Sequence, residues 1–218
     1  MAKTQKKAVG IPTIDVSLVV VRTGVVDGDD TNATEIAVDT ANKVGVEPQT
    51  ETTDAIKLVK DGRLIAQKPA KTTITGHQIT LTDNVFIPEL VKILQGGTVE
   101  GKGDTLTYTP PVAGSTDKGQ VFELDCYSAQ YDASGQIVRY EKITYPNCQG
   151  TPVAMSSEDN VFRVPEYTIN SAPKEGEAPY KISYTKTLPQ FADAVAVSDF
   201  GDESTLTEAG NGTSLKAK

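Results

Sequence analysis

The sequence predicts a mainly β protein in which two packed antiparallel sheets, sandwich-like or barrel-like, carry one flanking α-helix at about residues 84–95. Apolar and polar residues alternate along most of the chain, which is typical of strands with one buried face. One segment alone changes clearly to helical spacing, where a single apolar stripe contains Ile87, Leu90, Val91 and Leu94. We expect this stripe to pack over the sandwich or to seal a subunit interface.

The length of 218 residues fits one domain, because all-β domains often reach this size undivided. We expect residues 1–12 to form a mobile N-terminal arm and residues 13–189 to form the single β-sandwich domain. Residues 190–218 contain few large apolar side chains. They are predicted to be a C-terminal arm that is weakly ordered or becomes ordered on assembly.

The first predicted strand is Val16–Thr23, and residues 25–34 (VVDGDDTNAT) have the composition of a loop. The acids of this loop suggest a calcium site. However, the sixth and twelfth positions counted from Asp27 hold Asn32 and Val38, where an EF-hand requires Gly and Glu. We expect an acidic exposed loop.

The clearest predicted hairpin is AIKLVK-DG-RLIA, residues 55–66. Its turn, Asp61-Gly62, lies between two apolar alternations, and both residues can adopt the positive φ that a two-residue hairpin turn favours. The polar segment Lys43–Asp54 before it is expected to be an extended loop or the arm of a hairpin.

The strand that precedes the helix begins at Lys71, and its alternation places His77 and Ile79 on one face. Residues 82–84 (TDN) are candidate N-caps for the helix. Gly96-Gly97 is expected to end it, because glycine adopts a left-handed conformation without steric cost.

A long hairpin is predicted later in the chain, and its two strands are Gln120–Tyr131 and Ile137–Tyr145. Residues 146–150 (PNCQG) are expected to form a corner. Three further predicted strands are Thr151–Met155, Val161–Asn170 and Tyr180–Leu188.

The formal net charge of −8 argues against a protein that grips nucleic acid through a basic patch. Eight acids and one base lie between Asp27 and Asp54, whereas five bases and one acid lie between Lys57 and Lys71. Such blocks can be solvated faces, or they can be complementary surfaces that suit head-to-tail self-association. The candidate contact residues are Asp27, Asp29, Asp30, Glu35, Lys57, Lys60 and Arg63.

The N-terminal MAKTQKKAVGIP lacks the apolar run of a signal peptide, and the longest apolar run, Leu18–Val21, is too short to span a bilayer. We therefore expect no membrane partner. Cys126 and Cys148 could form one disulfide, but a chain made in the cytoplasm gives it no oxidising context. Free thiols are the expectation.

Residues with catalytic potential are few. His77 and Cys148 could pair as a general base and a nucleophile, but nothing in the local sequence marks such a pair. A zinc site would need both of these residues, Cys126 and a carboxylate, without the close ligand pairs typical of zinc. The glycine-rich segment 96–103 follows a helix, whereas a nucleotide cradle precedes one. We expect that the protein is not an enzyme and that it binds no cofactor and no metal.

Three segments carry a family resemblance. They are ITLTDNVFIPELVKILQGG (79–97), YEKITYPNCQGTPV (140–153) and RVPEYTINSAPKEGEAPYKISYTKTLP (163–189). In order and spacing, roughly residues 55–190 resemble the major tail (tail tube) proteins of long-tailed bacteriophages and related phage-tail-like particles.

The resemblance implies a β-sandwich with a flanking helix, six copies of which form a ring that stacks into a hollow tube. The charged residues above would then be ring-stacking candidates. Implied partners are further copies, tape-measure and tail-terminator or tip proteins, and DNA that passes an acidic lumen without specific binding. The implied location is the virion tail, assembled in the host bacterial cytoplasm. The alternative is a β-sandwich binding or adhesion module, although the sequence has no Trp for sugar stacking.

Overall fold

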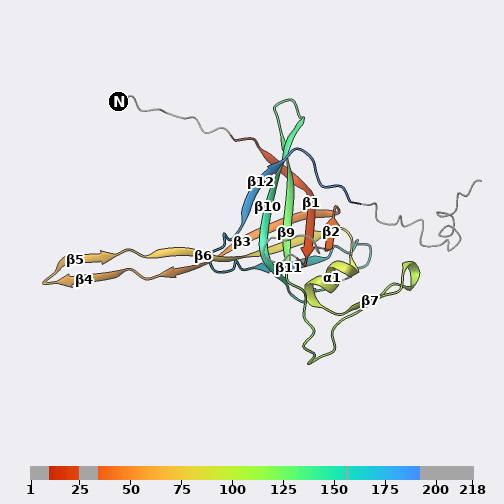
Figure 1. The fold of residues 1–218 in the computed structure, drawn as a ribbon, viewed down its shortest axis with the longest axis horizontal. Coiled ribbons are helices and arrows are strands. Elements are labelled where there is room, and N and C mark those ends of the chain that lie inside the picture. The colour runs from red at the N-terminus through yellow and green to blue at the C-terminus, as the bar shows by residue number, and fades with distance from the viewer. Residues whose placement is uncertain (1–9, 25–33, 156, 192–218) are drawn as a thin grey trace, which may run out of the picture.

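A computed structural model describes residues 10–24, 34–155 and 157–191 (Figure 1). The mobile arm predicted for residues 1–12 and the C-terminal arm predicted for 190–218 lie almost entirely outside these residues. The elements are β1 (Thr13–Thr23), β2 (Thr34–Val38), β3 (Ala41–Thr53), β4 (Ile56–Lys60), β5 (Arg63–Lys68), β6 (Lys71–Asp83), α1 (Pro88–Gln95), β7 (Thr98–Glu100), the 3-10 turn η1 (Gly103–Thr105), β8 (Thr107–Thr109), β9 (Phe122–Tyr131), β10 (Ile137–Gly150), β11 (Glu166–Ser171) and β12 (Lys181–Thr185).

The predicted fold class is confirmed. Hydrogen-bonded strands follow the order β2-β1-β9-β10-β11-β6-β3, and β12 pairs with β10. All of these pairings are antiparallel. Strands β1, β9, β10 and β12 cross β3, β6 and β11 at a steep angle, so the strands form two layers (Figure 1).

Strand β10 belongs to both layers. Residues 140–144 pair with β12, whereas residues 148–150 pair with β11. Between these two parts, the register with β9 shifts from Tyr145 to Cys148. The predicted corner lies here, since Pro146 has no N–H for the ladder and Asn147 adopts a φ of 50°.

The main core lies between the two layers and under the helix. Alternate residues of the strands face it, as the sequence predicts for Ile79. Its largest fully buried members are Tyr167, Ile79, Leu81, Leu90, Leu94, Leu124 and Ile169. A smaller cluster of Leu18, Val20 and Tyr127 lies on the opposite face of β1 and β9, packed against Ala37, Leu188 and Phe191.

The helix is shorter than predicted and begins at Pro88 rather than near residue 84. The ring of Pro88 disfavours the helical conformation for the preceding residue, and Ile87 is accordingly an extended N-cap with φ −109° and ψ 103°. Two of the predicted caps, Asp83 and Asn84, instead bind Thr40. Asp83 accepts from the Thr40 hydroxyl at 2.5 Å, and Asn84 Nδ2 donates to the Thr40 carbonyl at 3.0 Å. The predicted glycine stop is confirmed, with φ of 85° and 93° at Gly96 and Gly97.

The strand predicted at Thr151–Met155 is not formed, and the strand predicted at Val161–Asn170 starts too early. Residues 151–155 and 157–165 belong to a connection in which Ala154 makes one isolated bridge to Glu166, and β11 begins only at Glu166. Apolar alternation in Val161–Val164 suggested a strand, but these residues lie beyond the point where β6 can pair with the chain.

Candidate functional site

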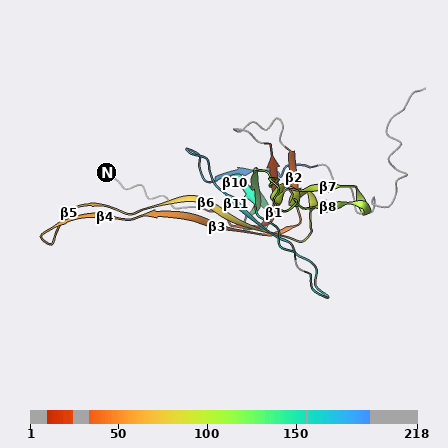
Figure 2. The same ribbon diagram turned by 90° about the horizontal axis from the view of Figure 1, so that it is seen from below.

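The most conspicuous surface feature is a long β ribbon, here called the arm, that comprises residues 49–75. It contains the end of β3, the β4–β5 hairpin and the start of β6, and it extends far from the body (Figures 1 and 2). Every residue from Val46 to Thr75 is exposed. Strands β3 and β6 pair along its length, with a bulge between Gln49 and Thr50.

The end of the arm, here called the tip, is the β4–β5 hairpin, residues 56–68. Asp61 and Gly62 adopt φ of 50° and 73°, so the predicted two-residue turn is confirmed. The strands pair from Ile56 with Lys68 to Lys60 with Arg63.

The tip carries large apolar side chains that are mostly exposed among the described residues. Their exposed fractions lie between 55% and 66%, and the residues are Ile56, Leu58, Val59, Leu64 and Ile65. An isolated two-stranded hairpin is only marginally stable in water, and exposed apolar patches mark interaction sites. The tip is therefore a candidate contact surface.

The bases predicted as contact residues, Lys57, Lys60 and Arg63, all lie on the tip and are exposed. Acids of the preceding block lie on the β3 side of the arm, at Glu51 and Asp54, and Glu47 lies just before the arm. The two charge blocks thus follow one another along the same projection. The predicted contact residues Asp27, Asp29 and Asp30 lie outside the described residues.

The remaining predicted contact residue, Glu35, is engaged within its own chain. Its Oε1 accepts from Arg22 Nε at 2.7 Å. Arg22 also donates to Glu123 Oε1 and to Asp125 Oδ2, both at 3.0 Å. Glu35 is thus held as the outermost member of a charged cluster on the face of β1 and β9 that is opposite the core.

Asp125 is the centre of this cluster, with a side chain only 1% exposed. Lys142 Nζ lies 2.8 Å from its Oδ2, and the Thr144 hydroxyl donates to its Oδ1 at 2.5 Å. Burial by itself lowers the pKa of Arg22 and Lys142, but the neighbouring carboxylates outweigh it and raise both pKa values. Sequence reasoning missed this cluster, although acids alternating with apolar residues in β9 were a visible signal.

The four predicted helix-packing residues lie where the stripe placed them. Leu90, Val91 and Leu94 are buried in the core, and Ile87 packs partly buried against it. The prediction omitted Ile93, which is also buried. The helix packs so tightly that a Cβ on Gly119 would overlap the carbonyl oxygen of Leu94, and one on Gly150 would overlap the Leu94 side chain.

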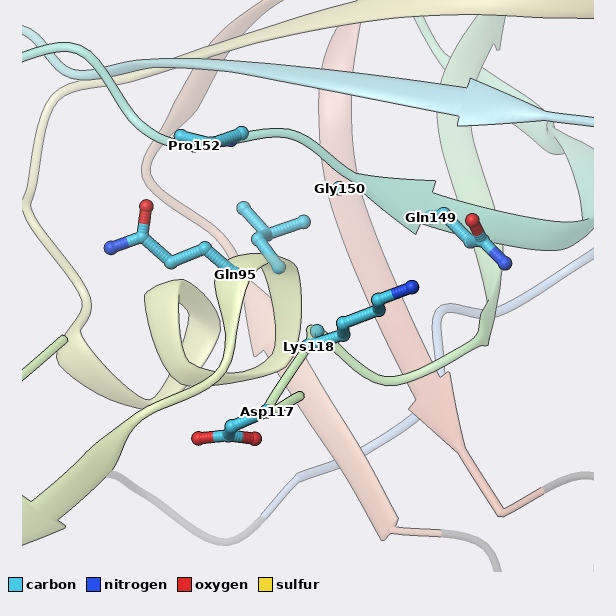
Figure 3. A pocket seen from close by; sticks show the side chains of 8 residues that line it. Gln95, Asp117, Lys118, Gln149, Gly150 and Pro152 are labelled. Atoms are coloured by element: carbon cyan, nitrogen blue, oxygen red, sulfur yellow. The ribbon is translucent and has the colours of Figure 1, made fainter. Parts of the chain in front are cut away.

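A hollow of about 330 Å³ lies beside the C-terminal end of the helix (Figure 3). Two of its polar side chains hydrogen-bond to the backbone of the chain itself. Gln95 Oε1 accepts from Val153 N–H at 2.8 Å, and Asp117 Oδ2 accepts from Gly97 N–H at 3.0 Å. Asp117 and Lys118 extend away from each other (Figure 3). The hollow offers no paired acid and base.

His77 and Cys148 are both buried. The His77 ring makes edge contacts with Tyr145 and Tyr180, with centroids 5.4 Å apart in each case, and burial lowers its pKa. Cys126 and Cys148 are free, and burial raises the pKa of the Cys148 thiol to about 12. A thiol with so high a pKa is a poor nucleophile near neutral pH.

Across residues 10–24, 34–155 and 157–191, no three His, Cys, Asp or Glu side chains gather as a metal site. A helix of the length and apolarity needed to cross a membrane is likewise absent from these residues.

No protein-family model matches the chain, and no curated protein matches it. Among solved structures, it is similar to a chain of the tube-terminating cap of the anti-feeding prophage, with 13% identity and a TM-score of 0.40 over 84% of this chain and 99% of that one. It is also similar to a chain of the anti-feeding prophage baseplate, with 10% identity and a TM-score of 0.36 over 83% and 97%. A likeness this distant assigns no function.

Proposed function

We propose that this chain is the structural subunit of a bacteriophage tail tube, which self-assembles into stacked hexameric rings. The observation that carries the proposal is the arm. The tip places five large apolar side chains in water at a distance from the core, and the described residues leave them more than half exposed, as is typical of an interaction site.

Unpaired strand edges support the same proposal. Among the described strands, β2 and β3 end the hydrogen-bonded path, and β12 pairs with β10 alone. Open edges are a hazard for a soluble monomer, and closing strands into a ring removes them. The resemblance of residues 55–190 to tail tube proteins points to the same kind of assembly.

The charge of the chain suits a conduit for DNA. With 29 acids against 21 bases, a tube of many copies repels phosphate and lets DNA pass without specific binding. The proposal assigns the chain no catalytic role. It places the chain in the virion tail, with tape-measure and terminator or tip proteins as its other partners.

Negative-stain electron microscopy of the concentrated, purified protein tests the proposal. We expect rings and tubes with a central channel. Monomers at all concentrations and salt conditions, together with no such subunit in virion tails, would overturn it. Monomers that bind a glycan or host-cell surface would instead favour the binding or adhesion module.

A further inference from the structure

A second apolar projection lies in the connection between β10 and β11. Its outer part, here called the Phe162 loop, comprises residues 157–164. The Phe162 side chain is 95% exposed, and Val161 and Val164 are 62% and 46% exposed. Arg163 lies over the Phe86 ring at 5.2 Å. That contact ties the loop to the body next to β6.

We propose that the Phe162 loop is the surface on which the tip of a second copy docks. The inference rests on the proposed function and names the receiving surface for the arm. Both surfaces expose large apolar residues to water in the described chain, so bringing them together removes both patches from water.

Charge complementarity identifies the two as partners. The tip carries one acid, Asp61, and four bases: Lys57, Lys60, Arg63 and Lys68. The Phe162 loop carries the exposed acids Glu158 and Asp159, while its one base, Arg163, is turned onto Phe86. A basic apolar tip therefore meets an acidic apolar loop.

The arm itself is a poorer receiving surface. Its β3 side offers the acids Glu51 and Asp54, but the residues around them are mainly threonines. Thr52 and Thr72, for example, hydrogen-bond to each other across the ribbon at 2.9 Å. Such a surface can attract the bases of a tip but cannot bury its apolar residues.

The geometry also requires a second copy. The arm and the β10–β11 connection project from opposite sides of the body (Figure 2), so a tip does not reach the loop of its own chain. A contact between opposite sides is heterologous: each copy gives a tip and receives one, and repetition adds copies in one direction.

Cysteine cross-linking tests the contact. Leu58→Cys and Phe162→Cys variants, each made separately, are mixed at the concentration used for assembly and oxidised. The natural thiols are buried and do not interfere. We expect a disulfide-linked dimer of the two variants at about tenfold the yield from Leu58→Cys mixed with the exposed control Val112→Cys, because a disulfide forms only between nearby Cβ atoms.

A charge exchange provides the second arm of the experiment. Glu158→Lys with Asp159→Lys should lower the cross-link yield at least about tenfold, and Lys57→Glu with Lys60→Glu in the partner should restore it. Yield equal to that of the control, or Leu58→Cys linking mainly to itself, overturns the inference. Tubes without the cross-link overturn the contact alone, whereas cross-linked chains without tubes support the contact and count against the tube.

Discussion

Arg22 and Asp125 join β1 to β9 through a hydrogen bond of 3.0 Å between Nη2 and Oδ2, on the face of the sheet opposite the core. Lys142 approaches the same oxygen at 2.8 Å. Two cations therefore depend on one buried carboxylate, and the loss of that carboxylate leaves both of them without their main counter-charge.

Asp125→Asn should lower the free energy of unfolding by about 1.5–3 kcal/mol, because Arg22 and Lys142 each lose a charge-assisted hydrogen bond while Arg22 keeps Glu35 and Glu123. Urea denaturation with an unchanged m-value measures the loss. The matched control is Glu35→Gln, because Glu35 binds the same Arg22. The Glu35 side chain is 39% exposed, so this substitution should lower the free energy of unfolding by less than about 1 kcal/mol. Equal losses for the two variants would contradict the role given to Asp125.

Stability should fall in alkaline solution. Burial raises the pKa of Cys148 from 9.0 to about 12 in the folded chain. Below pH 9 both states hold the proton, whereas above it the unfolded chain releases a proton that the folded chain keeps. This group therefore lowers the free energy of unfolding by at most about 1.4 kcal/mol per pH unit above pH 9.

Urea midpoints measured between about pH 7 and 10.5 check this dependence. Cys148→Ala should show a lower midpoint throughout and a shallower decline above pH 9. Cys126, Lys142 and Tyr145, whose pKa values are also raised, keep part of the decline in both proteins. Parallel curves for the variant and the parent protein would rule out the thiol as a cause.

Leu90→Ala and Leu94→Ala should each lower the free energy of unfolding by about 2–5 kcal/mol, because both side chains are buried in the main core between the helix and the strands. Thermal or urea unfolding measures the loss, and reduced solubility should accompany it. Lys92→Ala, on the exposed side of the same helix, should change stability by less than about 0.5 kcal/mol. A small effect at Leu90 or Leu94 would show that the helix is not part of the core.

Reversing Lys57, Lys60 and Arg63 to Glu should leave the unfolding midpoint almost unchanged, because all three are exposed. Tubes counted by electron microscopy should be shorter and fewer by at least about tenfold, since like charges then face each other across the contact. Reversal of the exposed Lys43, Lys102 and Lys181 provides the control. Normal tube length and yield in the first variant would exclude the bases of the tip from stacking.

Local patterns predicted the features that local physics decides. The Asp61-Gly62 turn and the glycine stop at Gly96 depend on backbone conformations that few residues adopt, so the residue types themselves indicate them. The start of the helix was predicted too early because three polar residues before Pro88 resemble caps. The side chains of Asp83 and Asn84 instead hydrogen-bond to Thr40, between β2 and β3, which sequence spacing does not show.

The charged cluster could not be predicted either, because sequence spacing does not show which distant segments come into contact. Arg22, Asp125 and Lys142 lie on three different strands, and only the pairing of β1 with β9 and of β9 with β10 brings them together. The extension of the arm beyond the body could not be predicted from the sequence either. Threonine-rich alternation predicts strands, but it does not tell whether a strand lies on the body or extends beyond it.

The pairing of β1 with β9 also has a consequence for biosynthesis. Arg22 and its partner Asp125 are 103 positions apart, so β1 leaves the ribosome long before the strand that covers its edge exists. At about 5–20 residues per second, the delay lasts about 5–20 s. Val19, Val20 and Val21, which are almost completely buried in the finished fold, lack their β9 neighbours during this delay. An apolar strand with an unpaired edge is a hazard for aggregation until β9 covers it.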